Sequence, residues 1–314
     1  MASEKSKVLV IGGTGHLGRK LVKASLVEGH PTYVLQRLEN CMDINKIQVL
    51  LRLKKRGAKF IEGSLLDHES LVRAVKQVDV VISALSQYHE TTIEAKLEFK
   101  VVDAIKEAGN VKRYVPAEYC IDPSRMFHTL EPAKGYDDRI LAARKAAQEA
   151  KIPYTSIAAN LFAGYYAPNL IQVDTLMPPK DKVNIFGDGN AKVIVLNEDD
   201  VATYTIKTID DPRTINKIVH LIPPENIVSQ NELIEIWEKL AGKKLNKAYF
   251  SAEDFLAMMT GANPFIQLLI SYNYPICYQG CLTNYEVREG EEEASKLYPD
   301  VKYTRVDEYL KLYL

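Results

Sequence analysis

The stretch VLVIGGTGHLGRKLV, residues 8–22, places three glycines between a short apolar run and an amphipathic segment. Gly12, Gly15 and Gly18 follow the spacing GxxGxxG. Gly12 permits a tight turn, Gly15 lets the backbone approach a phosphate, and Gly18 lets the helix lie close to the sheet. The start of that helix then offers amides and a partial positive charge to a diphosphate. A plain turn is the alternative, but the position after a strand predicts a dinucleotide-binding loop made of Gly12, Thr14, Gly15, His16, Leu17 and Gly18.

Short apolar runs alternate with amphipathic segments through the first half of the chain. Strands are expected over 7–11, 31–36, 58–62, 78–84, 112–115 and 154–158, and helices over 18–28, 43–56, 67–76 and 137–150, with a further helix ending at Gly109. This alternation predicts an α/β fold with a doubly wound, parallel, Rossmann-type sheet. We expect residues 1–159 to form the dinucleotide-binding domain. Residues 160–314 are expected to form mainly a smaller substrate-binding domain, interleaved with the last strands of the sheet.

Composition excludes several classes of protein. The 314 residues carry 40 Lys and Arg against 41 Asp and Glu, so the charge gives no general attraction to nucleic acid or to an anionic membrane. The basic run 52–56 lies on an expected helix and is interpreted as a solvated face. Four cysteines without paired CxxC spacing favour reduced thiols over a metal site. No secretory signal and no apolar run of about 18 residues is present, so a cytoplasmic protein is expected.

The residue at the end of the second strand indicates which dinucleotide is bound. An acidic side chain there would hold the ribose 2′-hydroxyl of NAD, whereas a basic one suits the 2′-phosphate of NADP. Arg37 occupies this place, and Lys46 on the next helix could add a second positive charge. Glu39 keeps NAD open as the alternative. The sequence therefore favours NADP(H).

The proton-transfer residues are harder to find. Many enzymes of this architecture use a Tyr-x-x-x-Lys pair on one helix face, where the ammonium lowers the pKa of the phenol. The literal match, Tyr298 with Lys302, contains a proline and is attributed to chance. In the expected place the chain has Tyr136, but Ile140 stands where the lysine would be.

Several motifs together resemble one plant family, that of the pinoresinol–lariciresinol, isoflavone and phenylcoumaran benzylic ether reductases. They cover essentially the whole chain, and YQGCLTNYE (278–286) is most similar to the pinoresinol–lariciresinol branch. The resemblance implies an NADPH-dependent enzyme of plant specialised metabolism with a small-molecule substrate, and a possible homodimer. The other motifs are GGTGHLG (12–18), VDVVISA (78–84), AIKEAGNVKRYVPAEY (104–119), IPYT (152–155), IFGDGNAKV (185–193), DDPRTINK (210–217) and EEEASKLYPDVKYT (291–304).

The chain departs from this family where protons would be transferred. The resemblance places the catalytic lysine of the family at Ile140, or at Arg139 if the alignment slips by one residue. Arginine is a poor proton shuttle because it stays protonated. The family also tends to carry a histidine where this chain has Tyr274. We therefore take Tyr136, Arg139 and Tyr274 as the catalytic candidates.

Tyrosines and the segment 265–278 are expected to form the pocket. Five tyrosines fall in segments that resemble the family's pocket walls, although filling the core is the favoured role for each of them taken singly, and residues 265–278 look like a pocket lid. The five are Tyr165, Tyr166, Tyr272, Tyr274 and Tyr278.

Three functions are compatible with these observations. The first is NADPH-dependent reduction of a phenylpropanoid-like or related reactive substrate. The second is a redox-neutral cyclisation or isomerisation of a reactive aldehyde or enol, for example a terpenoid or iridoid, in a pocket that acts by orientation and desolvation and holds NADP(H) without redox turnover. The third is a noncatalytic NADP(H)-binding protein.

Overall fold

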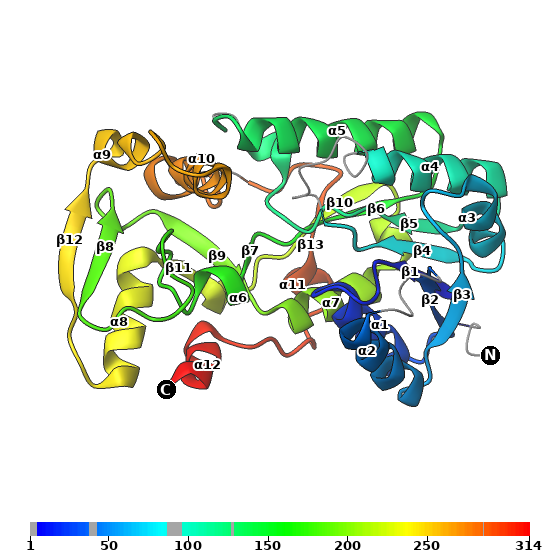
Figure 1. Ribbon diagram of the computed structural model, residues 1–314, viewed down its shortest axis with the longest axis horizontal. Helices are drawn as coiled ribbons and strands as arrows, with labels where there is room; N and C mark the ends of the chain where they lie inside the picture. Colours follow the sequence, from blue (N-terminus) through cyan, green and yellow to red (C-terminus); the bar gives the residue numbers. More distant parts are fainter. Residues whose placement is uncertain (1–4, 38–42, 87–95, 127–128, 285) are drawn as a thin grey trace.

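Five parallel strands form the central sheet of the protein, in the order β3-β2-β1-β4-β5 (Figure 1). The computed structural model describes residues 5–37, 43–86, 96–126, 129–284 and 286–314. Strands β1 and β4 are buried along their whole length, which explains their uninterrupted apolar sequences. The strands are β1 (Val8–Ile11), β2 (Thr32–Gln36), β3 (Lys59–Glu62), β4 (Val80–Ser83) and β5 (Arg113–Val115).

Helices cover both faces of this sheet. In Figure 1, α3, α4 and α5 lie on one side of it, and α1, α2 and α7 lie on the other. A separate apolar core fills each of the two interfaces. The arrangement confirms the doubly wound fold class that the sequence predicts. The helices are α1 (Gly18–Val27), α2 (Ile44–Lys55), α3 (His68–Val75), α4 (Leu97–Ala108), α5 (Ala133–Glu149) and α7 (Glu198–Thr208).

Helix boundaries follow local chemistry. Asp67 caps α3 by accepting a hydrogen bond from the Ser70 amide, and Gly109 ends α4 in the left-handed conformation with φ +68°. Helix α5 begins at Ala133, whereas the sequence analysis places its start at residue 137. The additional first turn buries Ala133 against the second half of the chain, a contact that the local sequence does not report.

Segments from late in the chain extend the sheet. Strand β6 (Thr155–Ala158) pairs with β10 (Lys217–His220), and β10 pairs with β13 (Glu292–Glu293), all in parallel. A single bridge between Tyr114 and Tyr154 links this group to β5. Elements beyond residue 160 thus contribute to both halves of the molecule, and the division into 1–159 and 160–314 stays a prediction.

The second half of the protein has its own apolar core, which includes Phe186, Trp237 and Phe255. Two small sheets surround it, β11-β9-β7 and β12-β8. Its strands are β7 (Leu161–Phe162), β8 (Lys182–Phe186), β9 (Lys192–Leu196), β11 (Ile227–Ser229) and β12 (Asn246–Phe250). Its helices are α6 (Ala163–Tyr166), α8 (Gln230–Ala241), α9 (Ala252–Ala257), α10 (Pro264–Gln279), α11 (Ala294–Leu297) and α12 (Val306–Leu310). Short 3-10 turns span Pro123–Arg125, Pro212–Thr214, Pro224–Asn226 and Lys311–Tyr313.

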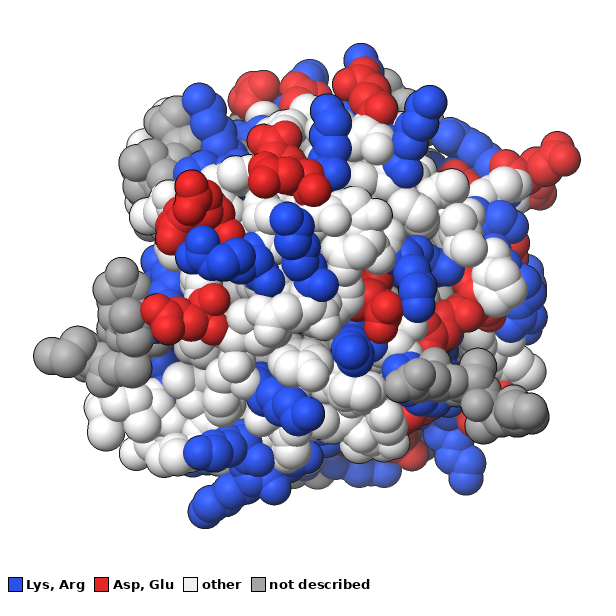
Figure 2. Space-filling model, turned by 90° about the vertical axis from the view of Figure 1, so that its right-hand side faces the viewer, with Lys and Arg blue, Asp and Glu red and all other residues white. Residues whose placement is uncertain are grey.

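Charged side chains of both signs share the surface at the sheet end of the molecule. Figure 2 shows Lys and Arg interspersed with Asp and Glu on this face. In the basic run 52–56, Leu53 is buried and the four basic residues are exposed. This pattern agrees with the interpretation of the run as a solvated helix face.

Candidate functional site

A cavity of about 450 Å³ joins the glycine loop to the second half of the chain. Its walls come from the loop after β1, the ends of β4 and β5, helix α5, the segment around β7 and α6, and helix α10. The lining is mostly apolar and aromatic. The residues are Gly12, Thr14, Gly15, His16, Leu17, Ala84, Leu85, Ser86, Ala117, Tyr119, Cys120, Ile121, Ile140, Asn160, Leu161, Phe162, Tyr165, Tyr166 and Tyr272.

The glycine loop forms one end of this cavity and has no room for side chains at its key positions. Gly12 has φ +79°, and a Cβ atom there would lie 2.6 Å from the Ala84 carbonyl oxygen. At Gly18 a Cβ atom would lie 2.1 Å from the Gly12 carbonyl oxygen. Helix α1 then begins without a side-chain cap at Leu17. A tight, uncapped helix start facing a cavity suits an anionic group such as a diphosphate.

His16 is held at the rim of the cavity. Its Nε2 lies 3.2 Å from Oε1 of Glu198, the first residue of α7. The Tyr165 ring packs against it at a tilted 56°, with the centroids 6.2 Å apart. These contacts connect the predicted cofactor loop to the second half of the chain.

A second hollow of about 520 Å³ lies beside the end of β2. Arg37 and Arg73 line it together with Glu62 and Asp67. Lys46 is not among the described residues that line it; its Nζ lies 3.7 Å from Oδ2 of Asp43 at the start of α2. Glu39, the residue that kept NAD open, lies outside the described residues.

Ile140 lies inside the main cavity and is only 3% exposed. No nearby lysine of α5 replaces the missing ammonium, because Lys134 and Lys145 point to solvent with side chains 53% and 74% exposed. They pair with Asp138 and Glu149 on the same helix. The position at which the family resemblance expects a lysine is therefore an apolar wall.

The three catalytic candidates from the sequence lie elsewhere. Tyr136 and Arg139 stack on each other in a cation–π contact, with the guanidinium 4.3 Å from the ring centroid. Tyr274 stacks on Tyr278, with ring centroids 5.4 Å apart. None of the three is among the described residues that line the cavity. Their catalytic roles stay predictions.

The pocket tyrosines divide into two groups. Tyr165, Tyr166 and Tyr272 line the cavity, whereas Tyr274 and Tyr278 pack against the apolar core of the second half. Helix α10, which covers the predicted lid segment, contributes Tyr272 as the one residue that the described cavity wall takes from it.

Asp137 is a buried carboxyl group that the sequence analysis did not select. It is 5% exposed on the inner face of α5, and the Tyr272 hydroxyl donates to its Oδ1 over 3.4 Å. Burial raises the pKa of Asp137 to about 6. The available signal was its spacing: Asp137 and Arg144 are the two charged positions on the buried face of α5, which otherwise contains Ala133, Ile140, Ala143 and Ala147.

The raised pKa of Asp137 makes a prediction about stability. A carboxyl group whose pKa is higher in the folded state favours folding at low pH, and this contribution is lost as pH rises through about 6. Asp137→Asn is therefore expected to be more stable than the wild type at pH 8 by about 1–2 kcal/mol, and nearly equal at pH 4.5. Urea unfolding at both pH values measures the difference. An Asn variant less stable at pH 8 would contradict the pKa shift.

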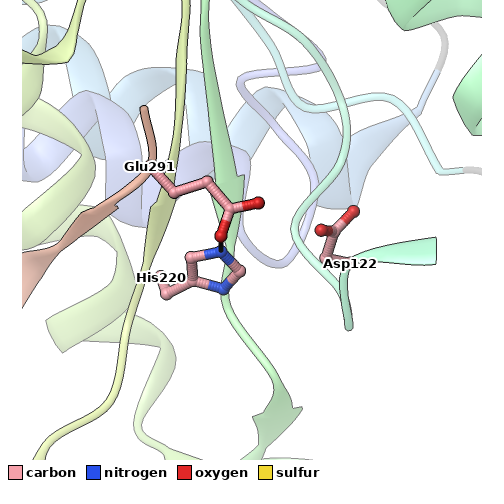
Figure 3. Close-up of side chains that lie close together, drawn as sticks. All are labelled: Asp122, His220 and Glu291. Atoms are coloured by element: carbon pink, nitrogen blue, oxygen red, sulfur yellow. Dashed lines mark hydrogen bonds and ion pairs between the residues drawn. The ribbon is translucent and has the colours of Figure 1, made fainter. Parts of the chain in front are cut away.

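A buried ion network lies near the cavity. Asp122, His220 and Glu291 place one ligand atom each within 4.8 Å of one another, and His220 Nε2 lies 3.1 Å from Glu291 Oε2 (Figure 3). Arg125 pairs with Glu291, and Arg144 pairs with Asp122. Burial lowers the pKa of His220, which favours the neutral imidazole. Because arginines already balance the carboxylates, the cluster is a structural ion-pair network that fixes the segment before β13.

Among the described residues, no helix is long and apolar enough to cross a membrane.

The fold and the cavity define a dinucleotide-binding α/β class, and the NmrA-like family model matches residues 4–310. The chain belongs to this family. It is 55% identical over 310 residues to an isoflavone reductase homolog of Lupinus albus, covering 99% of both chains. It is also 55% identical to a bifunctional pinoresinol-lariciresinol reductase of Linum perenne, covering 98% of each. These relatives confirm the resemblance drawn from the motifs.

Solved structures agree with the fold. A structure described as AtPrR2 with NADP+ and (+)pinoresinol has a TM-score of 0.95 at 52% identity, covering 99% of this chain and 100% of the other. The binary complex of leucoanthocyanidin reductase and NADPH from Vitis vinifera has a TM-score of 0.89 at 29% identity, covering 98% and 99%. The Rossmann-type architecture is thus shared along the whole chain.

Proposed function

We propose that this protein is an NADP(H)-binding enzyme of the plant phenylpropanoid reductase type, with a small, largely apolar substrate. The observation that carries the proposal is that the glycine loop, Ile140 and Tyr272 line one and the same cavity. A cofactor on the loop and a substrate against the aromatic walls would meet there. The relatives named as reductases, and the solved complexes with NADP+ or NADPH, support this assignment.

The residues present fit the dinucleotide. The loop from Gly12 to Gly18 has the close backbone approach that a diphosphate needs, and a side chain at Gly18 would close it. Arg37 lines the neighbouring hollow, where its guanidinium can pair with a 2′-phosphate, and we propose that Lys46 adds charge on that side. NADPH, when bound, supplies a hydride.

Ile140 restricts the substrate. Without a lysine at this place, the described cavity wall has no amine that could accept a proton from a phenol and so open a benzylic ether. A substrate that is already electrophilic, such as a conjugated carbonyl compound or a quinone methide, does not need this step. We propose reduction of such a compound as the first candidate reaction.

A redox-neutral reaction is the second candidate, and Ile140 is the observation that favours it. An apolar wall in place of a lysine suits a reactive aldehyde or enol that cyclises or isomerises when it is oriented and shielded from water. In this case NADP(H) would remain bound without turnover.

One experiment separates the two reactions. The purified protein is incubated with a plant metabolite extract in the presence of NADPH, NADP+ or no cofactor, and new products are identified by mass. The first candidate requires a product that has gained a hydride and a proton, with equal consumption of NADPH. The second requires a product of unchanged mass that also forms with NADP+. If no product appears under any condition, the noncatalytic alternative is favoured.

Ile140→Lys tests the role of the missing lysine. A lysine introduced here would be desolvated, which lowers its pKa toward that of a general base. We expect NADPH-dependent reduction of pinoresinol to increase at least about tenfold, equivalent to about 1.4 kcal/mol in the barrier. Ile140→Met is the matched uncharged control and should leave the rate unchanged. No increase, with cofactor affinity intact, would mean that more than this position separates the protein from its reductase relatives.

The resemblance to the plant reductases also suggests an oligomeric state and a compartment. We propose a homodimer in the cytoplasm. Light scattering of the purified protein tests the first statement, and imaging of the tagged full chain in plant cells tests the second.

A further inference from the structure

Asp137 and Tyr272 form a buried pair between α5 and α10, and Figure 1 shows these two helices side by side. Their exposed fractions are 5% and 8%, and the Tyr272 hydroxyl lies 3.4 Å from Asp137 Oδ1. Tyr272 lines the cavity together with Ile140, which follows Asp137 by one helical turn. The pair therefore reaches the cavity beside the place where the family resemblance expects a lysine.

Within the described part of the chain, the carboxyl group of Asp137 forms no ion pair, and Lys134 of the same helix pairs with Asp138 instead. The Oδ2 atom of Asp137 is buried and has no hydrogen-bond partner among the described residues. By contrast, Asp122, on the segment before α5, is paired with Arg144. A carboxyl group that is nine-tenths buried and only partly satisfied has a cost in stability, which is typical of a functional group.

Other tyrosines of the cavity lack this arrangement. Tyr165 is 56% exposed, and the hydroxyl of Tyr119 is buried without a hydrogen-bond partner among the described residues. Burial raises the pKa of Tyr166, and no carboxylate contributes to that shift. Within the described cavity wall, Tyr272 is the phenol with a carboxylate at hydrogen-bond distance.

We propose that Tyr272 and Asp137 form a proton relay that takes the place of the missing lysine, with Tyr272 as the catalytic residue and Asp137 as the positioning residue behind it. The inference rests on the proposed function and identifies the proton-transfer group of that site. The substrates it suits carry an ionisable hydroxyl, or a carbonyl group with an acidic neighbouring C–H.

The proton balance of the relay is simple. A substrate O–H or C–H bond breaks and its proton passes to the Tyr272 oxygen, while the Tyr272 proton passes to Asp137. The substrate becomes a phenolate or enolate, and Asp137 becomes a neutral acid. In the reverse direction, Asp137 returns its proton through Tyr272 to an oxygen or carbon of the product. No electrons are exchanged in either direction.

The groups around Asp137 set the pH range. Burial is the largest influence on the pKa of Asp137 and raises it, and Asp138 on the same helix raises it further. The nearby hydroxyls of Thr129 and Tyr272 and the ammonium of Lys134 lower it, but burial outweighs them. The thiols of Cys120 and Cys281 face it as well. Burial raises the pKa of Cys281 to about 12 and that of Cys120 well above its ordinary value, so both stay neutral. Among these neighbouring groups, Asp137 is the one whose pKa lies near neutrality, at about 6.

The kinetic test compares three variants on whichever product-forming reaction the extract experiment reveals. Tyr272→Phe is expected to lower kcat about 100-fold or more with KM changed less than about threefold. Where the relay removes a proton from the substrate, the wild-type rate should rise with pH through about 6, and where it delivers a proton to the product, the rate should fall through the same pH. Asp137→Asn should remove this dependence in either case. Tyr249→Phe, on β12 with 64% of the residue exposed and outside the described cavity wall, is the control with unchanged rate. A Tyr272→Phe enzyme within about threefold of wild-type kcat would overturn the proposal.

A second measurement keeps the relay testable if no turnover is found, in which case the proposed function itself has failed. Carbon NMR of labelled aspartate carboxyl groups, assigned by comparison with Asp137→Asn, should show Asp137 titrating near 6. Tyr272→Phe should raise this value, because the phenol stabilises the carboxylate, and Tyr249→Phe should not. A carboxyl group that titrates near 4, or one insensitive to Tyr272, would overturn the relay.

Discussion

Replacing Gly18 with alanine is expected to weaken NADPH binding at least about 100-fold, equivalent to about 2.8 kcal/mol at 1.4 kcal/mol per tenfold. A Cβ atom at this position would lie 2.1 Å from the Gly12 carbonyl oxygen and 2.9 Å from Gly13 Cα. Both contacts are with backbone, so the loop must move away from the helix to relieve them. The movement displaces the amides that would hold the diphosphate. Titration followed by cofactor fluorescence measures the loss.

Two further alanine variants separate binding from folding. At Gly15 a Cβ atom would meet the Gly12 carbonyl oxygen at 3.2 Å, a milder contact, so we expect a loss of about tenfold. Gly135 lies inside α5, where a Cβ atom would meet its nearest neighbours, both side-chain atoms, at 3.6 Å or more, so Gly135→Ala should bind normally and gain up to about 1 kcal/mol in stability. If a folded Gly18→Ala protein bound NADPH with normal affinity, the glycine loop would not be part of the cofactor site.

Arg144→Met is expected to cause the largest loss of stability, about 3–5 kcal/mol in the free energy of unfolding. The guanidinium lies 2.7 Å from Glu118 Oε2 and 3.2 Å from Asp122 Oδ1, and both carboxyl groups are less than 5% exposed. Methionine fills a similar volume but removes the cation beside the buried Glu118, and it leaves Asp122 with the more distant Arg125, whose Nε lies 3.8 Å from Asp122 Oδ2. Urea unfolding at pH 7 measures the effect.

The control for this prediction is Lys134→Met. Lys134 and Asp138 form an ion pair one turn apart on the exposed face of the same helix, with side chains 53% and 58% exposed. Removal of such a pair should change stability by less than about 1 kcal/mol. If the two substitutions changed the free energy of unfolding equally, burial would not determine how much the Arg144 ion pairs contribute to stability.

The pH dependence of the pair between Arg144 and Asp122 has a definite sign. Burial opposes ionisation of Asp122, but Arg144 and the hydrogen bonds from Ser124 hold the pKa of Asp122 below its ordinary value. A lowered carboxyl pKa contributes stability above the unfolded value of about 4, and the contribution is lost as pH falls through the folded value. The difference between wild type and Arg144→Met should therefore narrow in acid.

Local patterns predicted the sheet and the glycine loop well, because both depend on residues close together in sequence. The run VLVI has to be buried on both faces, and Gly12 to Gly18 encode a turn whose geometry excludes side chains. The boundary of α5 was less accurate, since its first turn is stabilised by contacts with the second half of the chain.

The pairing of Asp137 with Tyr272 could not be predicted from local sequence patterns. Asp137 and Tyr272 are 135 residues apart, and nothing in the period of either helix states that α5 and α10 meet. Family resemblance directed attention to Ile140 and to Tyr274, which marks the right helix but the opposite side of it. A carboxylate on the buried face of α5 was the local signal, and its meaning depends on Tyr272, its hydrogen-bond partner on α10.

The pairing of β10 with both β6 and β13 has a consequence for synthesis of the protein. The nucleotide-binding half emerges first from the ribosome, but its sheet gains the last two strands only after residues 217–220 and 292–293 have appeared. Glu291, which pairs with Arg125, also arrives late. The sheet of the first half is therefore completed only after the second half has been synthesised. We expect co-translational folding of this chain to end in one cooperative step instead of proceeding domain by domain.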